Sequence, residues 1–206
     1  VSSLGHAGAL RVRDFGEAED TIYIAEEYFE GDPLHSLIDP SGAVDTAGAL
    51  NLGIKMAEAV GTAHTRGVVH GLLTPESIAV GAGGEVKISD FYYLYALTQD
   101  LRTVEEFQGR DIIYCAPEVI SGGQPSFASD VYSLGVILYE LLTGRPPFEK
   151  DSALAVALEK EMMDLRGPRE LNPEIPRLLD SVILQCIKQD PGATYDDARK
   201  LVAALH

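Results

Sequence analysis

The chain has 206 residues, 46% of them hydrophobic, which is enough for one well-filled core but too few for two independent domains. Its 16 Lys plus Arg residues are outnumbered by 32 Asp plus Glu residues, so the formal net charge is −16. A charge of this sign repels nucleic acid and anionic lipid, and we expect neither as a partner. The composition favours a protein partner that is neutral or basic.

The cysteines and the apolar segments indicate neither an oxidising compartment nor a membrane. Cys115 and Cys186 each lie inside an apolar run, which favours small buried side chains over a disulfide or a metal pair. No apolar stretch reaches the length of a membrane span, and no basic and apolar leader follows Val1. We therefore expect a cytoplasmic domain.

The first predicted element is a β-hairpin between Leu10 and Glu26. Residues 10–15 and 21–26 alternate apolar and polar side chains on either side of a polar loop at residues 16–20. An isolated hairpin is only marginally stable in water. We therefore expect a partner, further sequence or a second copy of the chain to cover it, the last of these through self-association of the hairpin.

Two long helices are predicted in the middle of the chain. Residues 45–66 carry apolar side chains at spacings of three and four, with Asp45 as the N-cap and Gly67 at the end. Residues 126–143 are apolar nearly all round and are followed by Gly144. Such a pattern marks a buried central helix.

The remaining segments are shorter. Residues 77–80 and 85–89 flank a glycine-rich turn and predict a second small hairpin. The stretch that follows, up to Glu118, lacks strong periodicity, and a loop of that length usually has a functional role. Three further helices are predicted over residues 152–163, 176–187 and 195–205.

Four motifs in order resemble those of serine/threonine protein kinases. Residues 67–80 resemble the family's catalytic loop, whose pattern is H-R-D-L-K-P-E-N, and residues 88–92 stand where D-F-G stands. Residues 114–118 match the A-P-E stretch, and residues 129–148 are similar to the central helix and the turn after it. The spacing of the four is family-like, and the resemblance covers essentially the whole chain.

The resemblance implies a mainly α fold, namely the large C-terminal lobe of a protein kinase with a residual β-hairpin of the small lobe. It divides a single kinase-like domain of residues 1–206 into a remnant of the small lobe and hinge at residues 1–28 and a helical large lobe at residues 29–206. The family's Gly-rich loop, its phosphate-binding Lys and most of the helix with the partner Glu have no counterpart.

Several positions of the catalytic loop carry side chains that differ from those of the family. Phosphoryl transfer needs metal ligands, a cation on the phosphates and a carboxylate that orients the hydroxyl. The family's catalytic Asp falls on Leu72, and the adjoining Arg falls on Gly71. Thr74 takes the place of the loop Lys and Ser77 that of the metal-binding Asn, whereas His70 is retained. From these replacements we predict that the chain is not an enzyme but a pseudokinase.

The nucleotide site is degenerate in the same comparison. Asp90 stands where the family's metal-binding Asp belongs, but without its ligand partner a solvated or capping role is favoured. Tyr92 replaces a flexible Gly and either fills the nucleotide space or packs in the core. Glu26 corresponds to the gatekeeper, and Tyr28 follows it in the hinge. We expect no resident cofactor, no metal and little or no ATP binding.

Several structural positions of the family are kept. These are Ala116, Pro117 and Glu118 of the A-P-E stretch, and Asp130 of the central helix. In kinases the counterparts of His70 and Asp130 belong to the hydrogen-bonded scaffold under the catalytic loop. Thr194 replaces an Arg that usually pairs with the Glu of A-P-E, so Glu118 is expected to be exposed or differently paired. His64 is interpreted as a packing or capping residue.

The function predicted from the sequence is a catalytically inactive module that binds or scaffolds other proteins in signalling. Its support is the simultaneous loss of the catalytic Asp, the loop Lys and the metal-binding Asn beside a complete core. Two alternatives stay open. One is a divergent nucleotide-dependent transferase that uses Asp90, and the other is a domain excised from a larger regulatory kinase-like protein.

Overall fold

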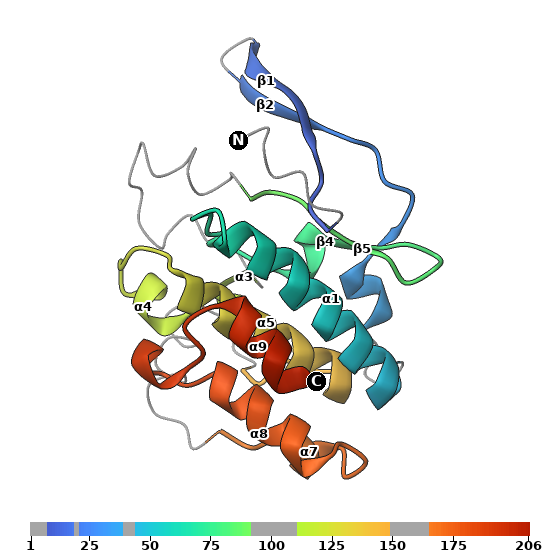
Figure 1. Ribbon diagram of the computed structural model, residues 1–206, viewed down its shortest axis with the longest axis vertical. Helices are drawn as coiled ribbons and strands as arrows, with labels where there is room; N and C mark the ends of the chain where they lie inside the picture. The colour runs from blue at the N-terminus through green and yellow to red at the C-terminus, as the bar shows by residue number, and fades with distance from the viewer. Residues whose placement is uncertain (1–7, 19–20, 39–43, 92–110, 149–164) are drawn as a thin grey trace.

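The computed structural model describes residues 8–18, 21–38, 44–91, 111–148 and 165–206. In this part of the chain, a helical body carries a narrow β-hairpin that projects beyond it (Figure 1). The mainly helical architecture with small sheets agrees with the fold class that the resemblance implies. None of the helices in these ranges combines the length and apolar character that a membrane span requires.

The projecting hairpin consists of β1 (Val12–Ala18) and β2 (Thr21–Glu26). The strands pair antiparallel, with Phe15 opposite Ile24 and a register irregularity between Val12 and Asp14. The strand β1 continues to Ala18, whereas the sequence placed a loop from residue 16 onward. The strand is longer than expected because its pairing with β2 continues as far as Ala18, which lies opposite Thr21. The connection is therefore shorter than predicted.

A second sheet links the hairpin to the body. It has the strand order β3-β4-β5, formed by β3 (Asp32–Pro33), β4 (Ile78–Val80) and β5 (Val86–Ile88). Before the hairpin, Ala9 forms a parallel bridge with Ile88 of β5. The chain thus enters and leaves the hairpin next to β5. Short 3-10 turns, η1 (Leu34–Leu37) and η2 (Pro75–Ser77), precede the next elements.

Two long helices form the centre of the body, as the sequence predicts. The helix α1 (Thr46–His64) is capped by the Asp45 carboxylate, which accepts a hydrogen bond from the Gly48 N–H at 2.6 Å. The helix α5 (Phe127–Thr143) begins at the Ser126 cap and ends at Gly144, whose φ of 73° suits glycine. Nearly every side chain of α5 is buried.

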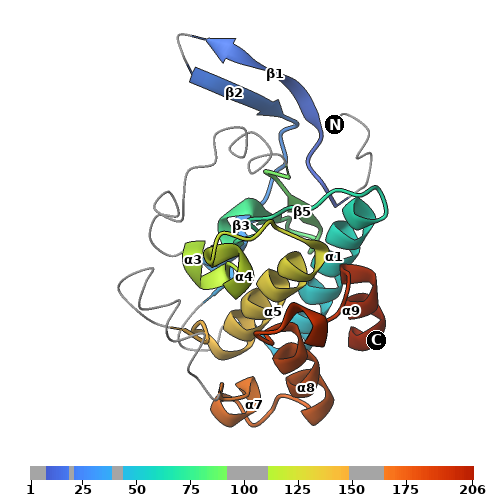
Figure 2. The same ribbon diagram turned by 90° about the vertical axis from the view of Figure 1, so that its left-hand side faces the viewer.

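The other helices surround α5. Figure 2 shows α5 with α1 and α9 on one side and α3 and α4 on the other. The helices are α3 (Asp111–Tyr114), α4 (Pro117–Ile120), α7 (Pro168–Leu171), α8 (Arg177–Cys186) and α9 (Ala198–Leu205), with the 3-10 turn η5 (Pro191–Ala193) before α9.

The predicted helices near the C-terminus have mixed outcomes. The prediction over residues 176–187 corresponds to α8, and that over 195–205 corresponds to α9. The second helix starts later than expected because the Asp197 carboxylate accepts the Arg199 N–H and so caps the first turn. The prediction over residues 152–163 lies outside the described residues.

Candidate functional site

The loop between α1 and β4 is fixed by a buried carboxylate of α5. Asp130 is only 1% exposed, and its two oxygens accept the backbone N–H groups of His70 and Gly71, both at 2.8 Å. Gly71 has a φ of 87°, a conformation that favours glycine over the Arg expected from the resemblance. The loop backbone is therefore held by hydrogen bonds rather than by its side chains.

The same carboxylate also binds a histidine of α1. The His64 Nε2 lies 3.0 Å from Asp130 Oδ2, and the His64 Nδ1 accepts the Ala198 N–H at 3.2 Å. Because Nδ1 is an acceptor, the ring is the neutral tautomer that donates from Nε2 to Asp130. The ring also stacks on Phe127 with centroids 4.3 Å apart. His64 thus joins α1, α5 and the start of α9.

His70 is buried beneath the segment after β5. Its side chain is 2% exposed, donates from Nε2 to the Ser89 carbonyl at 3.0 Å, and lies against the Phe91 ring at 4.8 Å. Its Nδ1 finds no hydrogen-bond partner among the described residues. Burial lowers the pKa of the imidazole, an effect opposed by the nearby Asp130 carboxylate. His70 therefore acts as a neutral spacer and donor.

The remaining loop residues differ in burial, and two of them close a turn. Leu72 is half-buried, and the next residue, Leu73, is fully buried. The Ser77 hydroxyl donates to the Thr74 carbonyl at 2.9 Å and accepts the Thr74 N–H at 3.3 Å. Both are buried, so these bonds satisfy the polar atoms of a closed turn.

Two carboxylates lie near each other where the hairpin meets the body. Asp90 is exposed, has a φ of 60°, and its carboxylate accepts the Ser89 hydroxyl at 2.7 Å. Burial raises the pKa of Glu26, and the negative charges of Asp90 and Glu27 raise it further, against a lowering hydrogen bond from the Asp90 backbone. The Glu26 and Asp90 carboxylates therefore lie close enough to repel one another.

The residues after Glu26 differ sharply in exposure. The Glu27 carboxylate forms an ion pair with Lys87 of β5 and accepts its hydrogen bond at 2.8 Å. This hydrogen bond is the main reason why the pKa of Glu27 is lowered. Tyr28 is 90% exposed, whereas Phe29 is half-buried.

Tyr92, which the sequence placed in the nucleotide site, lies outside the described residues. Across the described residues no group of three metal-binding side chains comes together.

The A-P-E stretch forms the start of α4. Ala116 is the buried N-cap of α4, Pro117 is its first residue, and Glu118 is half-buried. Nearby, the Tyr114 hydroxyl donates to Glu140 at 2.5 Å, inside the body. This pair was missed from the sequence, although a single acid within the apolar run of residues 131–142 signals a buried partner.

Thr194, which stands in the place of a family Arg, also has a structural role. It is buried, and its hydroxyl donates to the Cys186 carbonyl at 3.2 Å. This bond ties the segment before α9 to the end of α8, where carbonyl groups lack helical partners. The position thus contributes to the junction of two helices.

The fold and this arrangement agree with the comparison to known families. The family model described as protein kinase domain matches residues 1–196, and the chain therefore belongs to the protein kinase domain family.

Several known proteins match this chain over its full length. The chain is 33% identical over 205 residues to the serine/threonine-protein kinase PrkC of Bacillus subtilis, a match that covers 100% of this chain and 32% of the relative. Two relatives named serine/threonine-protein kinase PknB come from Mycolicibacterium smegmatis and Mycobacterium leprae. They are 32% and 31% identical over 213 and 215 residues, covering 100% of this chain and 34% of each relative. The chain thus spans about a third of their length.

These names overturn the prediction that the chain is not an enzyme. That prediction rested on individual side chains such as Leu72 and Ser77, whereas the relatives along the whole chain are named as kinases, which are enzymes. Replacements in one loop leave the family assignment unchanged, because identity over the full length and the scaffold around Asp130 carry it. The kinase-family part of the prediction is confirmed.

The Asp130 network is testable by one substitution. In Asp130→Asn, one acceptor oxygen becomes an NH₂ group that faces buried N–H donors of the loop. We expect a loss of about 1–3 kcal/mol in the free energy of unfolding, measured by urea titration, and faster amide exchange at His70 and Gly71. Asp196→Asn, at an exposed ion pair with Lys200, is the control and should change stability by less than about 0.5 kcal/mol. Equal losses in the two variants would contradict the network.

The buried His70 predicts an acid-dependent loss of stability. Its folded-state pKa is lowered, so the unfolded chain binds the proton first as the pH falls below about 6.5, the ordinary histidine value. The contribution of this group is fully present above that pH and decreases below it. His70→Gln keeps a donor for the Ser89 carbonyl but does not titrate, so its unfolding free energy should fall less between about pH 7 and 5.

The matched control for that measurement is His35→Gln. His35 is an exposed histidine, so its replacement is the comparison for the buried one. A slope that is unchanged in His70→Gln, or reduced equally in both variants, would assign the acid sensitivity to other groups.

Proposed function

We propose that this chain is a protein-binding domain of the serine/threonine-protein kinase family that recognises a basic protein segment. The proposed contact is the hinge surface, defined here as Tyr28, Glu30 and Asp32. The observation that carries the proposal is the 90% exposure of the Tyr28 ring. Glu30 and Asp32 are exposed beside it in the chain. An aromatic ring with two carboxylates suits Lys or Arg together with an apolar side chain.

The backbone around Tyr28 is anchored on both sides. The Glu27 N–H donates to the Arg11 carbonyl at 2.8 Å, and its carboxylate pairs with Lys87. On the other side, the Phe29 ring lies close to Gly31, where an added Cβ would come within 2.6 Å of it. An exposed aromatic side chain on a fixed backbone loses little conformational freedom on binding, which supports a docking role.

Weak affinity for ATP is part of the proposal. The Glu26 and Asp90 carboxylates lie where the resemblance places the back of the adenine pocket and a metal ligand. ATP carries several negative charges, which these carboxylates repel unless a cation intervenes. We propose that the domain works in the cytoplasm, a location compatible with its two buried free cysteines.

The docking proposal predicts a specific loss in Tyr28→Ser. The probe is a panel of synthetic peptides in which Lys and Arg alternate with Leu and Phe, with Glu-substituted counterparts of equal length. We expect calorimetry to detect only the basic peptides, and Tyr28→Ser to weaken their binding about tenfold or more, as for an aromatic anchor residue.

Leu178→Ser is the matched control. Leu178 is also a large exposed apolar side chain, 72% exposed, but it belongs to α8 in the helical body. Its replacement should leave peptide binding unchanged. Equal binding of basic and acidic peptides, or an equal loss in both variants, would refute the hinge surface as the contact.

Phosphoryl transfer to a protein is the second candidate function, favoured by the names of the relatives. The γ-phosphoryl group of ATP would pass to a Ser or Thr hydroxyl, ADP would leave, and the hydroxyl proton needs an acceptor. The half-buried Leu72 stands where the resemblance places that acceptor. The exposed Asp90 stands where the resemblance places a metal-binding carboxylate.

This candidate predicts a gain in Leu72→Asp. A carboxylate at this position should raise the rate of magnesium-dependent phosphate transfer to a mixture of Ser- and Thr-containing peptides by about 10²-fold. The rate is measured with ATP labelled at the γ-phosphate. Leu72→Asn, of the same shape but without the charge, should give no gain. Phosphoryl transfer through this position is excluded if the unmodified chain and both variants lack turnover, or if the two variants raise the rate equally.

A further inference from the structure

The first turn of α9 is hydrogen-bonded to a histidine of α1. The buried His64 accepts the Ala198 N–H on its Nδ1 at 3.2 Å. The two helices are in close contact around this bond, because a Cβ added at Gly61 would come within 3.3 Å of the Arg199 nitrogen. Helix α9 has only eight residues, and a helix of that length is not stable without tertiary contacts. The position of α9 therefore depends on what it contacts on α1.

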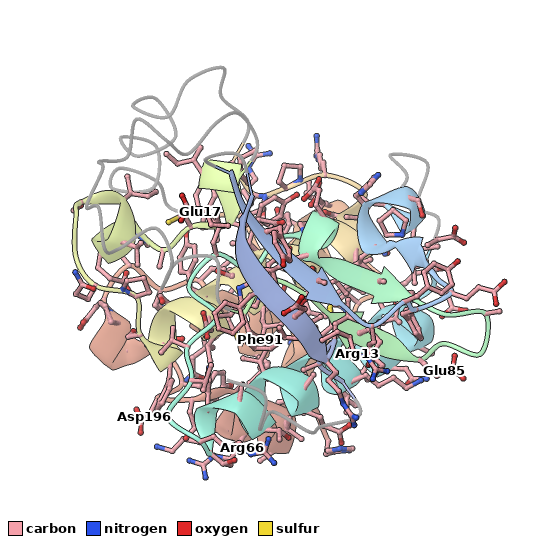
Figure 3. The ribbon with its side chains drawn as sticks, turned by 90° about the horizontal axis from the view of Figure 1, so that it is seen from above. Arg13, Glu17, Arg66, Glu85, Phe91 and Asp196 are labelled. Carbon is pink, nitrogen blue, oxygen red and sulfur yellow. The ribbon has the colours of Figure 1, made fainter. Side chains whose placement is uncertain are left out.

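Little apolar surface holds the first turn of α9 in place. Ala198 is buried, but the next two residues of the helix are exposed. Figure 3 shows Arg66, shortly after α1, and Asp196, shortly before α9, close together at the edge of the molecule. Opening the first turn would thus move mainly polar groups into water and uncover the small Ala198 side chain. The bond to His64 is then a large share of the free energy that keeps the turn closed.

His64 makes both of its hydrogen bonds only as a neutral imidazole. Its Nε2 carries the proton and donates to Asp130 Oδ2 at 3.0 Å, which leaves Nδ1 as the acceptor. A second proton can therefore bind only at Nδ1, and an imidazolium ring is a donor on both sides. The new Nδ1–H group would face the Ala198 N–H, which is also a donor, so this hydrogen bond would be lost.

The groups around the ring can accommodate a positive charge. On α5, the Asp130 carboxylate bonds to Nε2, and the Phe127 ring is stacked at 4.3 Å, an arrangement that also suits a cation. On α9, the Asp197 carboxylate is paired with Arg199 at 2.6 Å, so neither adds an uncompensated charge next to Ala198. Protonation thus strengthens the contact with α5 and removes the hydrogen bond to α9.

We propose that His64 is a pH-dependent switch for the last helix. When Nδ1 takes up a proton, the bond to Ala198 breaks and the first turn of α9 opens, while Asp130 keeps the imidazolium and the loop N–H groups in place. Histidine is the side chain whose charge changes between about pH 5 and 8, so the switch is tested in this range. The inference is independent of the proposed function, because neither His64 nor α9 belongs to the hinge surface.

The switch differs from ordinary acid unfolding in where it acts. Loss of the whole fold would expose all amides together, whereas protonation of His64 should expose Ala198. The amides of His70 and Gly71 bond to Asp130 and should stay protected. The charge-assisted bond from Nε2 continues to hold the Asp130 carboxylate. A loss of protection at Ala198 alone is therefore the signature of the switch.

The experiment is amide exchange followed by NMR on the unmodified chain at about pH 7.5 and about pH 5.5, on either side of the ordinary histidine pKa. Each rate is divided by the intrinsic rate at that pH, and the imidazole nitrogen shifts show when His64 is protonated. We expect the protection of the Ala198 amide to fall about tenfold at the lower pH, the effect of one lost hydrogen bond. His70 and Gly71 should show no such fall.

His64→Gln separates protonation of this ring from other effects of pH. The Gln side chain still donates toward Asp130 but does not titrate, so the protection of Ala198 should be equal at the two pH values. His206→Gln makes the same change at the exposed end of α9 and is the control. In this variant the fall at Ala198 should remain.

Several results would overturn the proposal. One is unchanged protection of Ala198 once His64 is protonated, and another is a His64 ring that stays neutral at about pH 5.5. An equal fall at Ala198, His70 and Gly71 would assign the effect to unfolding of the whole body. An equal fall at Ala198 in His64→Gln would assign it to other titrating groups.

Discussion

The Asp130 carboxylate is the interaction on which the described structure depends most. Its two oxygens hold the His70 and Gly71 N–H groups and the imidazole of His64. Through His64 the same group reaches Ala198 at the start of α9. One buried charge thus joins α1, the following loop, α5 and the last helix, and it is stable there because three donors replace the lost water.

This network explains how the loop keeps its shape with altered side chains. Asp130 accepts hydrogen bonds from backbone N–H groups of the loop. The loop therefore keeps its position without a carboxylate side chain at position 72 or an amide side chain at position 77. Ser77 instead closes a turn with Thr74, and the Ser89 N–H, one residue after β5, donates to the Ser77 carbonyl. The hydrogen-bonded scaffold is thus independent of the loop side chains, which is why their replacement was a poor guide to whether the chain is an enzyme.

The sequence predicted the long elements well because their signals are local. The Asp45 cap and the apolar periodicity predicted the bounds of α1 and α5 to within one or two residues. The motifs also led to the family, which the match over residues 1–196 confirms. Contacts between distant segments could not be predicted. The Tyr114–Glu140 and Glu27–Lys87 pairs, and the role of His64 between Asp130 and Ala198, depend on how helices and strands pack.

The position of Asp130 along the chain has a consequence for folding during synthesis. Its acceptor oxygens emerge from the ribosome about 60 residues after the His70 and Gly71 donors, and the Ala198 N–H follows His64 by 134 residues. Nascent chains that end before α5 therefore carry a complete α1 but lack the group that fixes the next loop. Such long sequence separations favour slow, late consolidation, so the body should become native only when nearly the whole chain has left the exit tunnel.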